Sequence, residues 1–243
     1  DGELIEYGKS EELFLNPINE YTKRLFQSQS SLWDVKKPDS MNEELIEVKN
    51  LNKEYGKNSL FKNLNFKLRK GEITSVVGVS GSGKSTLGDI LLGVKIPTSG
   101  EIIKSKSFDI LKFQKIYQQP PSAFLPNQIL EEGFKDLVKL HNLSMKKVYE
   151  YLKKVNLEKG LLKRKPHEVS GGELQRMAII KVLLLKPAFI FADEATSRLD
   201  SISQQEVIYL LVDIVKKEKL SLLLVTHDLE IAQKISNNIV YLK

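Results

Sequence analysis

A glycine-rich segment that ends in a lysine offers the most specific chemistry in the sequence. Gly78–Thr86 reads G-V-S-G-S-G-K-S-T and fits the pattern G-x-x-x-x-G-K-[S/T]. The apolar run Ile73–Val77 before it has the composition of a buried strand, and a helix is expected from Lys84. Inward-pointing backbone N–H groups and a helix N-terminus would then attract phosphate, with Lys84 on the β- and γ-phosphates and Ser85 on Mg²⁺. The alternative is an ordinary Gly/Ser turn.

Two adjacent carboxylates follow a second apolar run. Ala188–Ala192 reads A-F-I-F-A and leads directly into Asp193 and Glu194. An aspartate at the tip of such a strand suits a Mg²⁺ ligand, a position known from phosphoryl-transfer enzymes. The glutamate beside it can orient or deprotonate a water molecule. The alternative interpretation is an acidic pair that caps a helix.

A third motif makes the pattern specific to one family. Val169–Arg176 reads V-S-G-G-E-L-Q-R, which alone would be only a loop and a helix N-cap. Together with the two motifs above, it resembles the nucleotide-binding domain of ABC transporters, whose signature loop is L-S-G-G-Q. The remaining motifs of that family follow in order over about Leu45–Lys243.

The resemblance assigns roles to residues that would be weak signals alone. Tyr55 matches the aromatic residue that stacks on adenine, although a lone Tyr often only packs. Gln118, in I-Y-Q-Q-P-P, matches the Q-loop glutamine that touches Mg²⁺ near the permease contact. His227 matches the switch histidine that contacts the γ-phosphate, where a strand-end His is more often structural. Ser197–Asp200 matches the D-loop, which crosses the dimer interface.

The resemblance also implies a mechanism with ATP and Mg²⁺ as cofactors. Two such domains pair head to tail, so each ATP lies between one phosphate loop and the signature loop of the partner. Glu194 would act as base or water orienter, while His227 and Lys84 stabilise the γ-phosphate. The expected catalytic residues are Glu194, His227, Lys84 and Gln118, and the expected magnesium ligands are Ser85, Gln118 and Asp193. The expected nucleotide-binding residues are Tyr55, Gly78, Ser80, Gly81, Ser82, Gly83, Lys84, Ser85, Thr86, Ser170, Gly171 and Gly172.

Three positions depart from the family pattern. Glu173 stands where the signature usually has Gln, Gln119 follows the Q-loop glutamine where an acidic residue or Asn is common, and Arg198 replaces a small D-loop residue. None of them removes a phosphate ligand. A carboxylate near the partner's nucleotide could nevertheless lower activity through unfavourable charge.

The expected fold class is α/β, a P-loop NTPase with a mixed or parallel central sheet. An N-terminal antiparallel β subdomain and an inserted helical subdomain at about 120–178 complete it. The basis is strand-length apolar runs that alternate with helical stretches, which favour a parallel sheet covered on both faces. Hydrophobic residues make up 41% and charged residues 28% of the 243 residues, as in ordinary globular proteins.

Composition narrows the classes of function. The chain has no cysteine, which excludes disulfides, thiolate metal sites and cysteine nucleophiles within it. No apolar run approaches the ~20 residues that span a bilayer. The net charge of +6 could indicate nucleic acid or an anionic membrane surface, but lysines spread over solvated helix faces are the simpler interpretation.

The N-terminal residues predict a segment that does not belong to the main domain. Asp1–Gly8, Glu12–Pro17 and Tyr21–Lys23 resemble the C-terminal tail of ATPases in the oligopeptide, dipeptide and nickel importer subfamily. We therefore expect such a tail over 1–26, a polar linker over 27–42 and the ATPase domain over 43–243. A fragment of a tandem protein is favoured, and a permuted order with Met41 as natural start is the alternative.

The same subfamily resemblance names the partners. Pro166–Glu168 before the signature and the residues around Gln118 resemble importers of peptides, nickel or metal chelates, and the solute stays open. The expected partners are a second homologous ATPase domain, possibly fused in the same native chain, two transmembrane permease subunits and, indirectly, an extracellular solute-binding protein. The expected location is peripheral, on the cytoplasmic face of the cell membrane.

Two other classes of function share part of this sequence pattern. A soluble ABC ATPase that acts on nucleic acid or ribosomes usually carries coiled-coil insertions or a basic linker, and 87–169 holds neither heptads nor a Lys/Arg block. We therefore expect no nucleic-acid partner. A subunit that binds nucleotide without hydrolysing it would fit a degenerate site, but Glu194 and His227 argue against it.

Overall fold

A five-stranded parallel sheet lies at the centre of the chain, in the strand order β5-β6-β7-β3-β8. The structure is a computed structural model that describes residues 2–105 and 109–243. Every residue of β6 and β7 is buried, because helices cover both faces of the sheet. The five strands are β3 (Ile73–Gly78), β5 (Phe113–Ile116), β6 (Phe189–Asp193), β7 (Ser221–Val225) and β8 (Asn238–Leu242).

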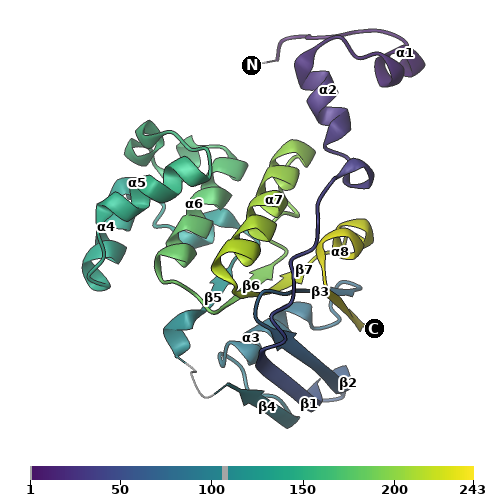
Figure 1. Cartoon of the computed structure of the whole chain (residues 1–243), viewed down its shortest axis with the longest axis vertical. Helices are drawn as coiled ribbons and strands as arrows, with labels where there is room; N and C mark the ends of the chain where they lie inside the picture. The colour runs from purple at the N-terminus through teal and green to yellow at the C-terminus, as the bar shows by residue number, and fades with distance from the viewer. Residues whose placement is uncertain (1, 106–108) are drawn as a thin grey trace.

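A second, antiparallel sheet packs beside α3 (Lys84–Leu91), which lies between the two sheets (Figure 1). Its strand order is β2-β1-β4. The side chains between the sheets include Val48 and Phe61 from the antiparallel sheet, Leu87 from α3, and Phe191 from the central sheet. The three strands are β1 (Glu44–Tyr55), β2 (Asn58–Arg69) and β4 (Ser99–Lys104).

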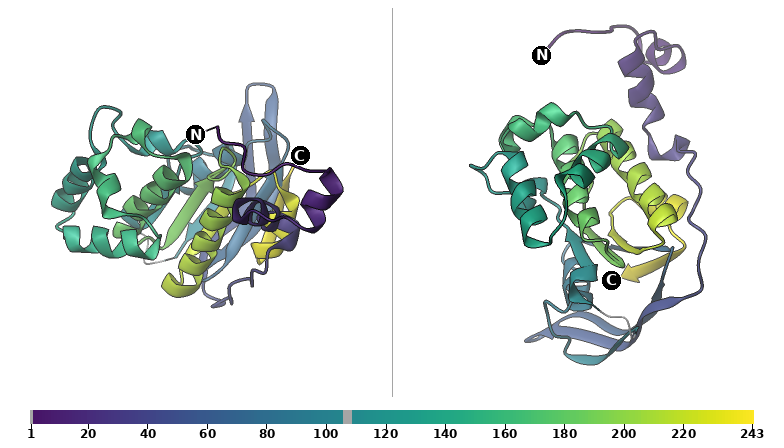
Figure 2. Two further views of the ribbon diagram at one scale, coloured as in Figure 1. Left: turned by 90° about the horizontal axis from the view of Figure 1, so that it is seen from above. Right: turned by 60° about the vertical axis from the view of Figure 1, so that its left-hand side comes forward.

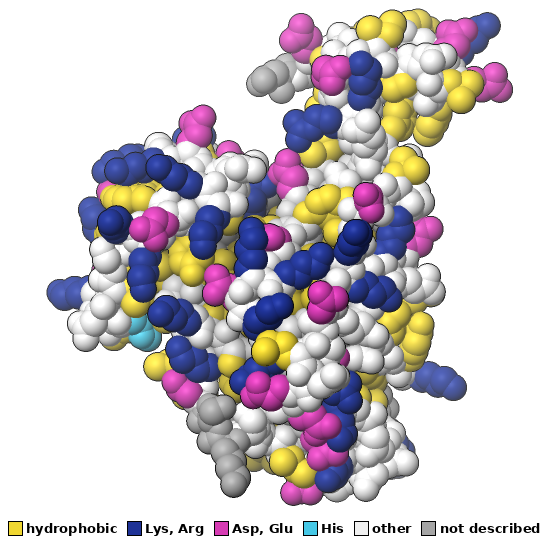
Figure 3. All heavy atoms as spheres, viewed as in Figure 1, with side chains coloured by type: hydrophobic (Ala, Val, Ile, Leu, Met, Phe, Trp, Pro, Cys, Tyr) yellow, Lys and Arg dark blue, Asp and Glu magenta, His cyan; other side chains and the backbone are white. Residues whose placement is uncertain are grey.

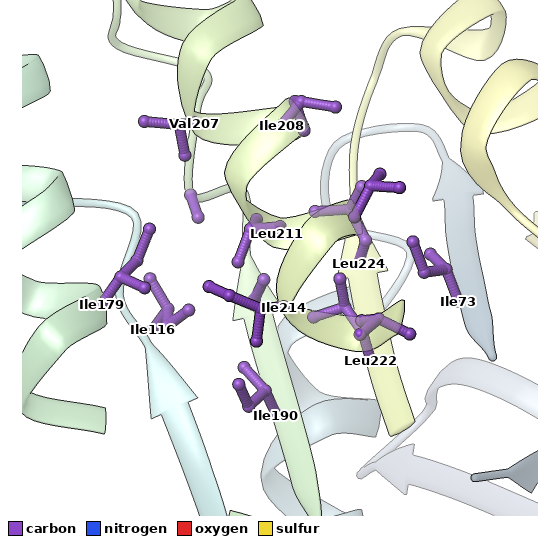
Figure 4. Close-up of a cluster of buried hydrophobic side chains, with 14 of the residues drawn as sticks. Ile73, Ile116, Ile179, Ile190, Val207, Ile208, Leu211, Ile214, Leu222 and Leu224 are labelled. Atoms are coloured by element: carbon purple, nitrogen blue, oxygen red, sulfur yellow. The ribbon is translucent and has the colours of Figure 1, made fainter. Parts of the chain in front are cut away.

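The opposite face of the central sheet is covered by α6 (Gly171–Leu184), α7 (Ser201–Glu218) and α8 (Leu229–Ile235). Figure 4 shows this core, in which Leu211 and Ile214 of α7 lie over Ile190 of β6 and Leu222 of β7. Alternate residues of β6 point to opposite faces, so Ile190 joins this core while Phe191 joins the one around α3. The sheet is therefore fixed from both sides.

A helical subdomain follows β5 and forms its own core. Phe134 of α4, Leu152 of α5 and Met177 of α6 are among its buried residues. Figures 1 and 2 show these helices gathered beside the central sheet, with α6 shared between the two. Its elements are η3 (Pro120–Ala123), α4 (Leu130–Leu140), α5 (Met145–Lys154), η4 (Lys159–Lys163), η5 (Pro166–Glu168) and α6.

The N-terminal segment stands away from this body (Figures 1 and 2). It contains α1 (Ser10–Leu15) and α2 (Glu20–Gln27), whereas η1 (Ser30–Leu32), which follows them, lies against α8, where Lys234 Nζ donates to the Ser31 carbonyl at 2.5 Å. Phe14 and Phe26 stack with their ring centroids 4.5 Å apart, and Arg24 pairs with Glu206 of α7 at 3.1 Å. Apolar side chains remain exposed on these helices, which is visible as yellow at the top of Figure 3.

The polar stretch after α2 packs on the body at one aromatic residue. Trp33 is only 5% exposed, donates from Nε1 to the Ser28 carbonyl at 2.9 Å and meets the Tyr209 ring edge-on. Further along, Asn237 donates to the Pro38 carbonyl at 2.8 Å. The stretch thus has almost no regular structure, yet it is bound across α7 and α8.

None of the helices within 2–105 and 109–243 combines the length and apolar character that crossing a membrane requires.

Candidate functional site

The phosphate-loop segment connects the end of β3 to the start of α3 and depends on its glycines. Gly81 and Gly83 have φ of +83° and +94°, in the left-handed region that other residues rarely adopt. A Cβ on Gly78 would lie 2.2 Å from the carbonyl oxygen of Leu242 on β8. Glycine is therefore required at Gly81 and Gly83 by the backbone conformation, and at Gly78 by the close approach of β8.

The Lys84 side chain folds back and hydrogen-bonds to the backbone of this loop. Its Nζ donates to the carbonyl oxygens of Gly78 and Val79, each at 2.9 Å, and the residue is 5% exposed. The loop thus surrounds an ammonium group at the N-terminus of α3, where the helix dipole is positive. Positive charge at this end of the loop suits an anion.

Further features of the loop fit a polyphosphate. The Ser82 hydroxyl is buried and has no hydrogen-bond partner. Buried polar groups normally have one, so this hydroxyl is available to an oxygen-rich ligand. A Cβ on Gly81 would meet no atom within 4 Å, so the loop is open at that position, and Ser80 beside it is exposed.

Ser85 and Asp193 meet across the gap between α3 and β6. The Ser85 hydroxyl donates to Asp193 Oδ1 at 2.7 Å. Hydroxyl and carboxylate oxygens are the hard ligands that Mg²⁺ prefers, and Mg²⁺ usually takes few of them from protein and the rest from phosphates and water. In the described part of the chain, no group of three or more His, Cys, Asp or Glu that could hold a metal occurs. The pair fits Mg²⁺.

A lysine that lies outside all of the sequence motifs also contacts Asp193. Lys115 of β5 lies 3.1 Å from Asp193 Oδ2 and 2.8 Å from Asp89 Oδ1. Burial alone would lower the pKa of Lys115, but the two carboxylates outweigh it and raise that pKa. Burial alone would likewise raise the pKa of Asp89, but Lys115 and Lys95 lower it. The only sequence signal for this contact is a charged residue in a short strand.

Glu194 is held between two other predicted residues. Its Oε1 lies 2.6 Å from His227 Nε2, and its Oε2 accepts a hydrogen bond from Gln118 Nε2 at 2.7 Å. Glu194 has φ +49°, a left-handed conformation, and its carbonyl accepts a hydrogen bond from the Ser197 hydroxyl at 3.0 Å. Three residues far apart in sequence thus meet just past the ends of β5, β6 and β7, at the edge where open parallel sheets bind ligands.

Tyr55 ends β1, and the residue is 49% exposed. The ammonium of Lys53 lies over that ring, 4.5 Å from its centroid. The ring is thus available to a ligand and is already in contact with a cation. Its predicted role in adenine stacking remains a prediction.

The signature residues form the start of α6 rather than part of the phosphate loop. Ser170 is the N-cap, and its hydroxyl accepts a hydrogen bond from the Glu173 backbone N–H at 3.3 Å. The Glu173 carboxylate in turn accepts from the backbone N–H and the hydroxyl of Ser170, each at 2.8 Å. A Cβ on Gly172 would lie 2.7 Å from Ser203 Oγ, so α6 and α7 can approach only with glycine there.

The structure therefore gathers most of the predicted residues and keeps one group apart. The phosphate loop, Asp193, Glu194, Gln118 and His227 lie along the same edge of the central sheet. The group Ser170–Gly172 lies on α6, which packs on the opposite face of the sheet from α3.

The chain matches the ABC transporter family model over residues 61–197. The oligopeptide transport ATP-binding protein OppF of Streptococcus pyogenes serotype M1 is 35% identical over 221 residues, which cover 82% of this chain and 72% of OppF. The peptidoglycan transport ATP-binding protein YejF of Agrobacterium fabrum is 30% identical over 268 residues, which cover all of this chain and 49% of YejF. The chain thus spans about half the length of that relative.

Solved structures agree with this assignment. The dimeric post-hydrolysis structure of the ATP-binding cassette MJ0796 bound to ADP and Pi has a TM-score of 0.68 at 31% identity, over 82% of this chain and 94% of that one. The cbiO1 subunit of the cbiONQ transporter from Clostridium perfringens has a TM-score of 0.70 at 26% identity, over 83% and 86% of the two chains. The expected P-loop fold with its antiparallel and helical subdomains is thereby confirmed, and the chain belongs to the ABC transporter family as an ATP-binding cassette of the ATPase type.

Proposed function

We propose that this chain hydrolyses ATP as the nucleotide-binding part of an importer for peptides. The relatives support the solute class, since OppF and AmiF are named as oligopeptide transport proteins. A neighbour described as a putative metal-chelate type transporter keeps metal chelates as the other candidate solute. The chain would act at the cytoplasmic face of the membrane, bound to two permease subunits that receive solute from an extracellular binding protein.

The single observation that carries the proposal is the arrangement of Glu194 between Gln118 and His227. The Glu194 carboxylate is fixed through both oxygens and lies one residue from Asp193, whose carboxylate meets Ser85. A fixed carboxylate beside a phosphate site can orient a water molecule and accept its proton, while catalysis otherwise needs positioning and charge stabilisation.

Each remaining group has a role in this chemistry. The loop N–H groups and Lys84 bind the β- and γ-phosphates, and His227 stabilises the transferred phosphate. Ser85, Asp193 and Gln118 would hold Mg²⁺, which neutralises charge on the phosphate oxygens when bound. Tyr55 would stack on the adenine ring.

A second cassette completes the site in this proposal. The signature residues Ser170–Gly172 begin α6, on the other face of the sheet from the phosphate loop, so they are suited to a nucleotide held by a partner. Head-to-tail pairing places each signature over the phosphate loop of the other cassette. The dimeric structure of MJ0796 supports such pairing.

We also propose that the partner cassette is part of the same native protein. The alignment with YejF runs along all of this chain and half of that protein, and it keeps the N-terminal segment ahead of the cassette. This order supports a tail over 1–26, a linker over 27–42 and a cassette over 43–243. Covalent linkage would raise the effective concentration of the two halves.

The test is Glu194→Gln, which keeps the size of the side chain and removes its basicity. We expect phosphate release to fall by about 10²–10⁴-fold, the usual worth of a general base, while a fluorescent ATP analogue still binds. The Glu150→Gln variant, on the exposed face of α5, is the matched control and should keep the parent rate. Hydrolysis by Glu194→Gln at the parent rate would refute the assignment.

A further inference from the structure

Lys115 places an ammonium group next to Asp193, one of the residues proposed to hold Mg²⁺. The side chain is 19% exposed and lies between α3 and β6, in contact with Asp89 on the helix and Asp193 on the strand. Its Nζ lies over the ring of Phe191, 5.1 Å from the ring centroid. Few protein cations are this enclosed without a specific partner, and this one has two.

The contacts form a chain of alternating charge. Asp193 pairs with Lys115 at 3.1 Å, Lys115 with Asp89 at 2.8 Å, and Asp89 with Lys95 at 3.0 Å. An isolated lysine this close to Asp193 would repel a divalent cation. Because Asp89 compensates it, the Lys115–Asp89 pair adds no net charge beside the site.

The geometry fixes both oxygens of the Asp193 carboxylate. Oδ1 accepts from the Ser85 hydroxyl at 2.7 Å, while Oδ2 faces Lys115. With both oxygens held, the carboxylate cannot rotate about its last bond without breaking a contact. Partners that hold a metal ligand in this way commonly decide its affinity for the metal.

We propose that Lys115, braced by Asp89, is a positioning residue that orients Asp193 for the divalent cation bound with the nucleotide. The inference rests on the proposed Mg²⁺ site formed by Ser85 and Asp193. In this proposal, Mg²⁺ raises the affinity for the nucleotide only if Lys115 of β5 is in place, although β5 itself contributes no phosphate ligand.

The experiment compares the affinity for a fluorescent ATP analogue with Mg²⁺ and with EDTA. The double variant Lys115→Met with Asp89→Asn removes the ion pair that holds Asp193 but leaves the net charge of the chain unchanged. A difference in metal affinity therefore cannot come from a change in net charge. We expect the metal-dependent gain to fall by about 10-fold or more, the usual effect of losing such a partner. Affinity in EDTA should not change, and Mn²⁺ binding in the presence of the nucleotide, read by electron paramagnetic resonance, should weaken in parallel.

Two variants serve as controls. Lys95→Met breaks only the ion pair between Lys95 and Asp89, so Mg²⁺ should raise the affinity for the ATP analogue as much as in the parent chain. Lys115→Arg can still contact both carboxylates and should restore most of it. A gain that is unchanged or larger in the double variant overturns the proposal.

The melting temperature of each variant, measured without nucleotide, shows whether the variant is folded. A folded variant with a reduced metal-dependent gain has lost affinity for a reason other than misfolding. If the double variant is too unstable to assay, Lys115→Met alone carries the test. That change leaves extra negative charge, which would attract Mg²⁺, so a lower gain can come only from lost positioning. If the parent chain binds the analogue with no gain from Mg²⁺, the magnesium site itself is refuted. If only the variants fail to differ from the parent, Lys115 alone is refuted.

Discussion

Glu194 and His227 face each other across the ends of neighbouring strands, with Glu194 Oε1 and His227 Nε2 2.6 Å apart. The parallel pairing of β6 and β7 aligns Asp193 with Val225, so the residues just beyond each strand reach the same place. A contact between residues 33 positions apart in sequence therefore follows from sheet register. The histidine thus has a defined protein partner in Glu194.

Replacing His227 by Ala should slow hydrolysis more than it weakens binding. The imidazole is proposed to stabilise the γ-phosphate, and it also holds one oxygen of Glu194, so both positioning and charge stabilisation are lost. We expect phosphate release to fall by about 10²–10³-fold, the usual effect of removing one group that stabilises transition-state charge. Steady-state phosphate release and analogue binding measure the two effects. His141→Ala, at the C-cap of α4, is the control. An equal loss in binding and in rate would show that His227 acts only in nucleotide binding.

Glu173→Gln should strengthen ATP-dependent pairing of two cassettes. Glutamine still fits a capping box with Ser170, so the start of α6 is preserved. The substitution removes a negative charge from the loop that is proposed to face the partner's nucleotide. We expect a several-fold increase in the dimer fraction with ATP, measured by size-exclusion chromatography in the Glu194→Gln background.

The matched control for that experiment is Glu168→Gln. Glu168 caps η5 by accepting from the Lys165 N–H at 2.7 Å, and it is not one of the signature residues. Its change should leave pairing unaltered. Equal dimer fractions in Glu173→Gln and the parent chain would show that the carboxylate does not oppose pairing.

The sequence predicted the parts of the fold in which local signals and burial agree. The apolar runs Ile73–Val77 and Ala188–Ala192 match β3 and β6 to within one residue at each end, and the helix start at Lys84 is confirmed. Continuous apolar runs mark strands buried on both faces, and the loop motif fixes the adjoining helix. The fold class followed from these elements in order.

The elements that the sequence did not predict are those held by distant partners. Strand β4 has only exposed or half-exposed residues and pairs with β1 through an irregular register at Asn52. Strand β5 is four residues long and contains Gln114 and Lys115, so its pattern is not apolar. The contact between Lys115 and Asp193 could not be predicted either, because the two residues are far apart in the sequence and only the pairing of β5 with β6 brings them together.

Gly88→Ala should destabilise the chain although it is a small change in a helix. A Cβ at this position of α3 would lie 2.1 Å from the ring of Phe191, which is fully buried. Overpacking costs about 1–3 kcal/mol, more than the ~1 kcal/mol that alanine gains over glycine in a helix. Urea unfolding should therefore show a lower free energy of unfolding. Gly160→Ala is the control, since its Cβ would meet nothing within 4 Å. A variant as stable as the parent would mean that α3 can move away from β6.

Trp33→Ala tests whether the N-terminal stretch contributes to the stability of the cassette. The indole joins the core around α7 and α8, and Lys234 of α8 donates to the Trp33 carbonyl at 3.1 Å. Removing a buried aromatic side chain of this size costs about 3–5 kcal/mol. Leu32→Ala, at a position that is 63% exposed, should change stability by less than about 0.5 kcal/mol. Both values come from urea unfolding of the full chain followed by circular dichroism. Equal stability of the two variants would mean that the stretch is only tethered to α7 and α8, and that the cassette core folds without it.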